Sequence, residues 1–230
     1  MNRGKLYVVA TPIGNLGDMT FRAVEVLKSV AFILAEDTRE SIKLLKRYDI
    51  PTQLISYRDQ NHAKMMVKIL EKLDMGLDLA LVSDCGTPLI SDPGFKLVRE
   101  LREKEYIVES IPGPTAVTSA LSISGLPTDK FSFLGFLPKS DKKRKDILKK
   151  YLELNSTIVL YESPKRMIRL LEILDSICEG CSIVLARDLT KKREEVLQSS
   201  AKGLIEILKE RGFDKDPHGE FVVIISPQKE

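Results

Sequence analysis

The sequence is poor in cysteine and histidine, and this limits the kinds of site that it can form. Its 230 residues include three cysteines and two histidines, and the histidines lie outside every motif discussed below. Cys178 and Cys181 have C-x-x-C spacing, but no second pair completes a zinc site, and three cysteines are too few for a disulfide framework. The pair follows a helical pattern instead of beginning one, so we expect two reduced thiols near a helix end and no bound metal.

Long apolar runs are absent, and no charged-then-apolar segment opens the chain. No run reaches the roughly 20 residues of a membrane helix, so we expect a cytoplasmic protein without a membrane partner. The net charge of +3 is too small to indicate the charge of a partner, so any basic surface must be local. With 43% hydrophobic and 30% charged residues, the chain is typical of one large or two small soluble domains.

Both common phosphate-binding motifs, G-x-G-x-x-G and G-K-[ST], are missing, so phosphate binding by a glycine loop is unsupported. Short apolar runs nevertheless alternate with helical patterns. In the first half, strands are predicted at 6–10, 31–35, 53–57, 79–82 and 106–110. This alternation predicts an α/β fold with a mostly parallel sheet and helices on both faces. The alternation is followed by the rigid turn Ile111-Pro112-Gly113-Pro114, and we predict two domains, 1–114 and 115–230.

The most constrained loop, 83–94, follows the apolar strand 79–82 and holds two glycines, two prolines and two aspartates. One interpretation is an ordinary turn with Asp92 as N-cap before Pro93 at the first helical position. That cap leaves the sequence Ser-Asp-Cys-Gly-Thr-Pro at 83–88 unexplained. Loops at the carboxyl ends of buried parallel strands are where open α/β sheets bind ligands, so we favour a ligand loop.

Two charged stretches have an ordinary and a functional interpretation. Asp37 or Thr38 is expected either to cap a helix or to belong to a polar cluster beside the loop 83–94. The basic run 138–150 is either a solvated helix face or a surface that binds RNA phosphates.

Seven motifs together resemble the small-subunit ribosomal RNA methyltransferases of the tetrapyrrole methylase superfamily. They span nearly the whole chain, and the one departure noticed is Cys85, where that family usually has alanine. In chain order they are Thr-Pro-Ile-Gly-Asn-Leu at 11–16, Ala-Glu-Asp-Thr-Arg at 35–39, Ser-Asp-Cys-Gly-Thr-Pro-Leu-Ile-Ser-Asp-Pro-Gly at 83–94, Ile-Pro-Gly-Pro-Thr at 111–115, Tyr-Glu-Ser-Pro-Lys-Arg at 161–166, Ala-Arg-Asp-Leu-Thr-Lys at 186–191 and Gly-Glu-Phe at 219–221.

The resemblance implies two α/β domains, the second with a mixed sheet, and S-adenosylmethionine bound in a cleft between them. It also implies a homodimer that methylates a cytidine ribose 2′-hydroxyl in the decoding region of 16S ribosomal RNA, and we expect this RNA to be bound within the small ribosomal subunit. Matched by motif, the cofactor-binding residues would be Pro12, Asp84, Gly86, Thr87, Pro88, Thr115, Ala116, Tyr161 and Leu189. The alternatives are a methylase of a tetrapyrrole or protein side chain, and a nucleotide- or RNA-binding module without catalysis.

The ribose hydroxyl that receives the methyl group needs a protein group that takes its proton or accepts a hydrogen bond from it. Candidates at predicted strand ends are Glu36, Asp37, Glu162, Lys165 and Arg187. We select Asp37 as proton acceptor or acceptor-orienting group, with Lys165 second if burial lowers its pKa. Guanidinium groups bind phosphate oxygens in pairs, and basic side chains give RNA affinity. For RNA binding we therefore select Arg39, Lys142, Lys143, Arg144 and Arg166.

Overall fold

The computed structural model describes residues 3–227. The chain divides into two compact units, Met1–Thr115 and Ala116–Glu230, here called the N-terminal and the C-terminal unit and described separately. Among the helices of residues 3–227, none has both the length and the apolar character to cross a membrane.

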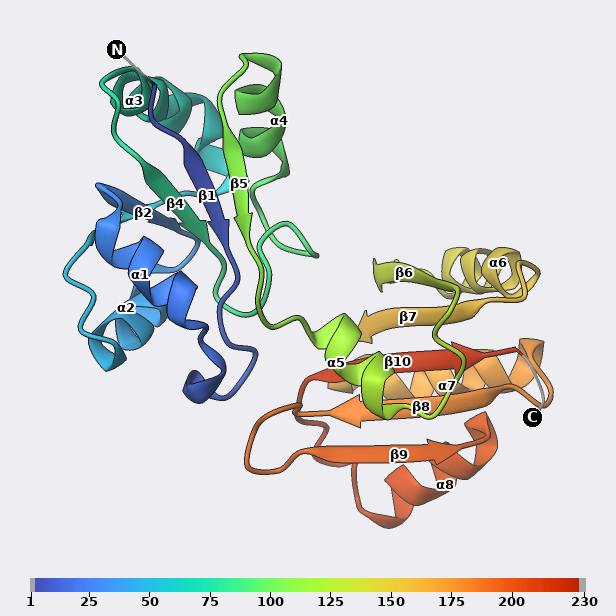
Figure 1. The fold of residues 1–230 in the computed structure, drawn as a ribbon. Coiled ribbons are helices and arrows are strands. Elements are labelled where there is room, and N and C mark those ends of the chain that lie inside the picture. The colour runs from blue at the N-terminus through green and yellow to red at the C-terminus, as the bar shows by residue number, and fades with distance from the viewer. Residues whose placement is uncertain (1–2, 228–230) are drawn as a thin grey trace. The chain divides into compact units, whose positions relative to one another are not determined.

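The N-terminal unit is built on a five-stranded sheet in which every pairing is parallel (Figure 1). The strand order is β3-β2-β4-β1-β5, so β4 is central and lies between β1 and β2. The strands are β1 (Leu6–Val9), β2 (Phe32–Ala35), β3 (Gln53–Ser56), β4 (Leu79–Val82) and β5 (Val108–Ile111). The helices are α1 (Phe21–Ser29), α2 (Thr38–Arg47), α3 (His62–Asp74) and α4 (Phe95–Glu103).

Helices cover both faces of this sheet, as the alternating pattern predicts. Ala80 and Val82 of β4 belong to a core cluster with residues of α1 and α2, whereas Leu79 and Leu81 pack with residues of α3 and α4. All four residues of β4 are therefore buried, which is why this strand reads as an unbroken apolar run. The carboxyl ends of the five strands share one edge of the sheet.

The C-terminal unit contains a mixed sheet of order β6-β7-β10-β8-β9, in which only β6 and β7 are parallel. Helices α6, α7 and α8 supply side chains to the core on one face, and α5 packs on β10 (Figure 1). The strands are β6 (Phe131–Phe136), β7 (Thr157–Glu162), β8 (Ser182–Arg187), β9 (Glu195–Ser199) and β10 (Phe221–Ser226). The helices are α5 (Ala116–Ile123), α6 (Asp141–Leu152), α7 (Pro164–Ile177) and α8 (Ala201–Glu210).

Two local predictions are wrong. Cys178 and Cys181 form a disulfide instead of reduced thiols, because the turn after α7 brings their Cα atoms to 5.6 Å, within the range that a disulfide spans. Asp92 does not cap α4. That helix begins at Phe95, with Gly94 as its N-cap. Gly94 has φ of 120°, which glycine adopts easily, so the helix begins later than it would with Asp92 as the cap and Pro93 as the first helical residue.

Candidate functional site

The loop after β4 is joined to the loop after β1. The Thr11 N–H donates to the Gly86 carbonyl at 2.8 Å, and the Gly86 N–H donates to the Pro12 carbonyl at 3.4 Å. Gly86 has φ of +77°, and a Cβ there would lie 3.2 Å from Cγ2 of Ile13. A side chain at this position would therefore press the two loops apart, so glycine is needed for their close approach.

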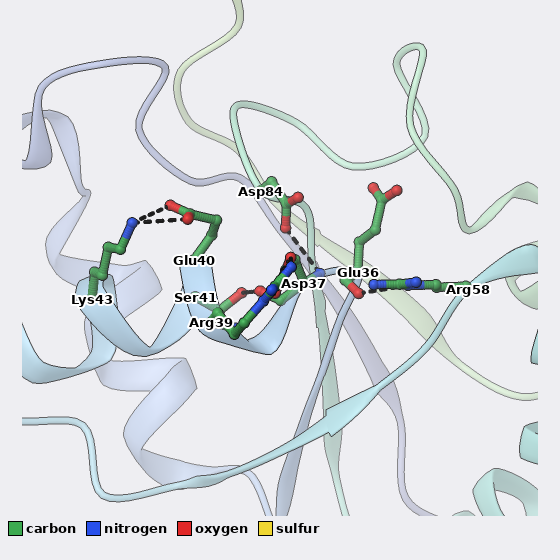
Figure 2. Close-up of polar contacts among 8 residues, drawn as sticks. All are labelled: Glu36, Asp37, Arg39, Glu40, Ser41, Lys43, Arg58 and Asp84. Atoms are coloured by element: carbon green, nitrogen blue, oxygen red, sulfur yellow. Dashed lines mark hydrogen bonds and ion pairs between the residues drawn. The ribbon is translucent and has the colours of Figure 1, made fainter.

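The same loop contacts its neighbours on either side. The Thr87 hydroxyl donates to the Pro114 carbonyl at 3.0 Å, which joins it to the segment after β5. Asp84 Oδ1 accepts the Asp37 N–H at 3.1 Å, which joins it to the end of β2 (Figure 2). Predicted cofactor residues of the N-terminal unit are thus brought together around the central strand; they are Pro12, Asp84, Gly86, Thr87, Pro88 and Thr115.

The backbone of this loop is unusual. Gly86, Leu89, Ser91 and Gly94 all have positive φ, and Leu89 and Ser91 adopt this conformation at a steric cost that glycine would avoid. Such strain persists only where the surroundings fix it, and it gathers at functional sites. The loop is therefore built for more than connecting β4 to α4.

Asp37 caps α2, as one of the two interpretations predicts. Its Oδ1 accepts the Arg39 N–H at 2.9 Å, and its two carboxyl oxygens also accept from the Arg39 guanidinium (Figure 2). These hydrogen bonds hold the pKa of Asp37 well below its usual range. The carboxyl is therefore a weak base, and the Arg39 group chosen to hold a phosphate is already engaged.

The pKa values of Glu36 and Asp92 are raised, in contrast to that of Asp37. Within residues 3–227, no hydrogen bond or ion pair engages the Glu36 carboxyl group, and burial together with the nearby Asp84 charge raises its pKa (Figure 2). Burial also raises the pKa of Asp92 to about 6; a hydrogen bond with Ser83 opposes the rise, while Glu36 and Asp84 add to it. A carboxyl group whose pKa is raised is a better proton acceptor near neutral pH than one whose pKa is lowered.

Arg58 and Asp59 also belong to this edge and were not predicted. Arg58 Nε donates to the Glu36 carbonyl at 3.1 Å, and Asp59 Oδ1 accepts the Gly94 N–H at 3.4 Å. Their position could have indicated this, since both lie in the loop that follows β3, as Glu36 lies in the loop that follows β2. Asp92 was misassigned for a different reason, because Asp-Pro is also a common helix start.

In the C-terminal unit, three motif residues form one row across the sheet. Phe221 of β10 pairs with Glu162 of β7 on one side and with Arg187 of β8 on the other. Tyr161 precedes this row and packs edge-on against the Phe133 ring at 5.0 Å. Of the predicted cofactor residues, Tyr161 is the last residue but one of β7, buried Leu189 follows β8, and Ala116 begins α5.

The structure separates the basic residues predicted to bind RNA. Lys142 and Lys143 are exposed on α6, but Arg144 is only 2% exposed and its Nε donates to the Pro138 carbonyl at 3.4 Å. Arg144 faces the interior because the helix turns it away from its neighbours, so its assignment to the RNA surface is wrong.

The guanidinium group of Arg166 also has partners within the protein. Its Nη2 lies 2.5 Å from Oε1 of Glu162, a residue that is 1% exposed, and its Nη1 donates to the Leu137 carbonyl at 3.1 Å. Lys165 is exposed, so it lacks the burial on which its catalytic assignment depended. In the part of the chain that the structure describes, no group of three or more His, Cys, Asp or Glu residues is arranged to hold a metal ion.

Comparisons with known proteins agree with this architecture. A family model described as Tetrapyrrole (Corrin/Porphyrin) Methylases matches residues 5–205. Two relatives named Ribosomal RNA small subunit methyltransferase I are 46% identical (Vibrio cholerae; 96% of this chain, 76% of the relative) and 45% identical (Hydrogenobaculum sp.; 97% and 96%).

Two solved structures resemble the fold at low sequence identity. Diphthine synthase superposes with a TM-score of 0.75 at 12% identity, covering 98% of this chain and 90% of that one. Cobalt precorrin-4 methyltransferase superposes with a TM-score of 0.69 at 17% identity, covering 96% and 94%. At these identities the likeness concerns the fold alone.

Proposed function

The chain belongs to the tetrapyrrole methylase family, and on this premise we propose that it methylates a cytidine ribose 2′-hydroxyl in the decoding region of 16S ribosomal RNA. The substrate is inferred from relatives that are 41–46% identical and named for the small-subunit ribosomal RNA. S-adenosylmethionine is the proposed methyl donor, and the cytoplasm the proposed location. The observation that carries the proposal is the set of loops joined around the end of β4.

The residues at this edge fit that cofactor. S-adenosylmethionine, when bound, supplies a methyl group on a positively charged sulfur, and it also carries an ammonium group and a carboxylate. Carboxylates are available for the positive groups at Glu36, Asp84 and Asp92. The absence of a phosphate-binding glycine motif is consistent with a ligand that has no phosphate. Gly86 keeps the loops after β1 and β4 close, which shapes a surface of backbone groups beside apolar Pro12 and Pro88.

We assign the acceptor-activating role to Glu36 and leave Asp37 a positioning role. Asp37 is held by Arg39 and its pKa is lowered, so it is the weaker base of the two. The Glu36 carboxyl has a raised pKa and no competing partner among the described residues, which suits it to take the proton of a ribose hydroxyl. The rest of the rate acceleration would come from positioning, which supplies up to about 7–11 kcal/mol in favourable cases.

For RNA binding we retain the exposed lysines of α6, Lys142 and Lys143, and Arg39 at the start of α2. Arg39 is 84% exposed, and its guanidinium donates to Asp37 through Nε and Nη2, which leaves Nη1 for a phosphate while the pair with Asp37 is kept. A homodimer acting on the small ribosomal subunit remains part of the proposal, and light scattering of the purified protein measures its mass directly.

The function is tested by mapping ribose methylation in 16S ribosomal RNA by mass spectrometry, with and without the gene for this chain. We expect one cytidine to lose its 2′-O-methyl group when the protein is absent, and to regain it when the wild-type protein is added to isolated small subunits. An unchanged methylation map would refute the proposal.

The catalytic assignment is tested by single-turnover methyl transfer with Glu36→Gln and Asp37→Asn. We expect Glu36→Gln to slow transfer by about 10²–10⁴-fold, the usual contribution of general acid–base catalysis. Asp37→Asn keeps the capping oxygen and is expected to retain most of the rate. The reverse order would return the acceptor role to Asp37.

A further inference from the structure

The loop after β8 holds two residues in a conformation that they rarely adopt. Asp188 has φ of 50° and Thr190 has φ of 65°, and the buried Leu189 lies between them. For a β-branched residue such as Thr190 this is a genuine outlier. Residues in such regions cost about 1–3 kcal/mol each and persist only where neighbouring contacts hold them.

Asp188 joins this loop to the neighbouring segment. Its N–H donates to the Glu220 carbonyl at 2.9 Å, and its Oδ1 accepts the Glu220 N–H at 3.0 Å, so the two residues are joined in both directions. Its own carbonyl accepts the Lys191 N–H at 2.9 Å, which closes the loop around Leu189. One residue thus ties the strained loop to the segment that enters β10.

Gly219 makes room for this arrangement. It has φ of +99°, and a Cβ there would lie 2.7 Å from Nε of Arg187 and 3.1 Å from Oδ2 of Asp188. The Arg187 side chain has little space to retreat, because its guanidinium lies 5.6 Å from the ring centres of both Phe213 and Phe221. A side chain at this position would therefore press on Arg187 and on the Asp188 carboxyl group, and it would also be strained by the positive φ.

We propose that Asp188 and Gly219 form a latch that positions Leu189 for cofactor binding; this inference rests on the proposed function, which assigns Leu189 to the cofactor site. Both are positioning residues, since they act through Leu189. The hydrogen bonds between Asp188 and Glu220, and not the ion pairs of Lys191, carry the effect. Lys191 Nζ lies 3.7 Å from Oδ1 of Asp188 and 2.8 Å from Oε2 of Glu220, but its side chain is one-third exposed and such pairs contribute little.

The experiment is titration calorimetry of S-adenosylmethionine with the full chain and four variants. Asp188→Ala removes the acceptor and also disfavours positive φ, so we expect affinity to fall by about tenfold or more. Gly219→Ala places a methyl group against Arg187 and the Asp188 carboxyl group, and we expect it to lower the affinity by a similar factor. Asp188→Asn keeps an acceptor oxygen and tolerates positive φ, so it should stay within about threefold of wild type. Lys191→Met is the matched control, and its affinity should also stay within about threefold of wild type.

A second readout separates the latch from the proposed function. Hydrogen exchange of the Glu220 amide in the free protein should accelerate in Asp188→Ala and Gly219→Ala but not in Lys191→Met. If wild type fails to bind S-adenosylmethionine, the proposed function falls, and unchanged Glu220 protection would overturn the latch itself. If wild type binds and both Asp188→Ala and Gly219→Ala bind equally well, the positioning role is refuted. Should Asp188→Ala fail to fold, Gly219→Ala decides.

Discussion

Replacing Asp92 by asparagine is expected to stabilise the protein at pH 8 and to change its stability little at pH 4. Burial raises the pKa of this carboxyl to about 6, against about 3.9 in an unfolded chain. A raised folded pKa means that the native state favours the protonated group. The resulting stability is fully present below the unfolded pKa and is lost as the pH rises through 6. Asparagine is neutral at every pH and avoids that loss.

The magnitude follows from the difference of about two pKa units, which corresponds to at most about 3 kcal/mol at 1.36 kcal/mol per unit. Asp92 is only half-buried, and solvent screens its charge, so we expect about 1–1.5 kcal/mol. For a chain of this size that is a rise in melting temperature of about 2–6 °C. The hydrogen bond with Ser83 is expected to survive, since an amide oxygen accepts as a carboxylate oxygen does.

The assay is thermal unfolding of wild type and Asp92→Asn at pH 4, 6 and 8, followed by calorimetry. Asp129→Asn, which changes an exposed carboxylate of the C-terminal unit, is the control and should show no comparable trend. A variant that is less stable than wild type at pH 8, or whose effect is the same at all three pH values, would refute the electrostatic reasoning.

Three further predictions concern the C-terminal unit. Changing Lys142 and Lys143 together to alanine should weaken RNA binding and lower the log–log salt slope by about 0.7–0.9 per lost phosphate contact, whereas Lys28→Ala on α1 should leave the slope unchanged; equal slopes for all would refute the RNA surface. Arg144→Ala should lower the urea midpoint without altering the salt slope, because its side chain is buried. Glu162→Gln should cost about 3 kcal/mol in urea unfolding, since it leaves a buried arginine contact without its charge; a loss below about 0.5 kcal/mol would contradict this.

The positions of strands and helices follow from local patterns, and the sequence predicts them well. The run 79–82 is apolar at every position because β4 is covered on both faces, and it is a strand over those residues. Helix α5 begins at Ala116, directly after the turn at which we placed the domain boundary. The helix after β2 begins at Thr38, because the Asp37 cap allows polar residues in its first turn.

Partners of charged side chains were harder to predict, because they depend on contacts distant in sequence. Arg144 stands in a run of basic residues with Lys142 and Lys143, yet only the arginine faces the interior. Arg166 is four residues from Glu162, a spacing that permits an ion pair on a helix or at its start, but the burial that makes the pair permanent comes from β7 and β10. The Cys178–Cys181 disulfide depends in the same way on the turn that follows α7.

The carboxylates at the edge of the N-terminal sheet connect stability to function. The Asp84 charge raises the pKa of both Glu36 and Asp92, and the Glu36 charge also raises the pKa of Asp92, so at neutral pH the negative charges at this edge oppose folding. Fold alone gives no reason to keep them, since asparagine or glutamine would preserve the hydrogen bonds without the repulsion. A ligand that carries two positive groups gives such a reason, because it compensates on binding the repulsion that the free protein bears. Groups with perturbed pKa values gather at functional sites for this reason, and Glu36 and Asp92 lie beside the most strained loop of the unit.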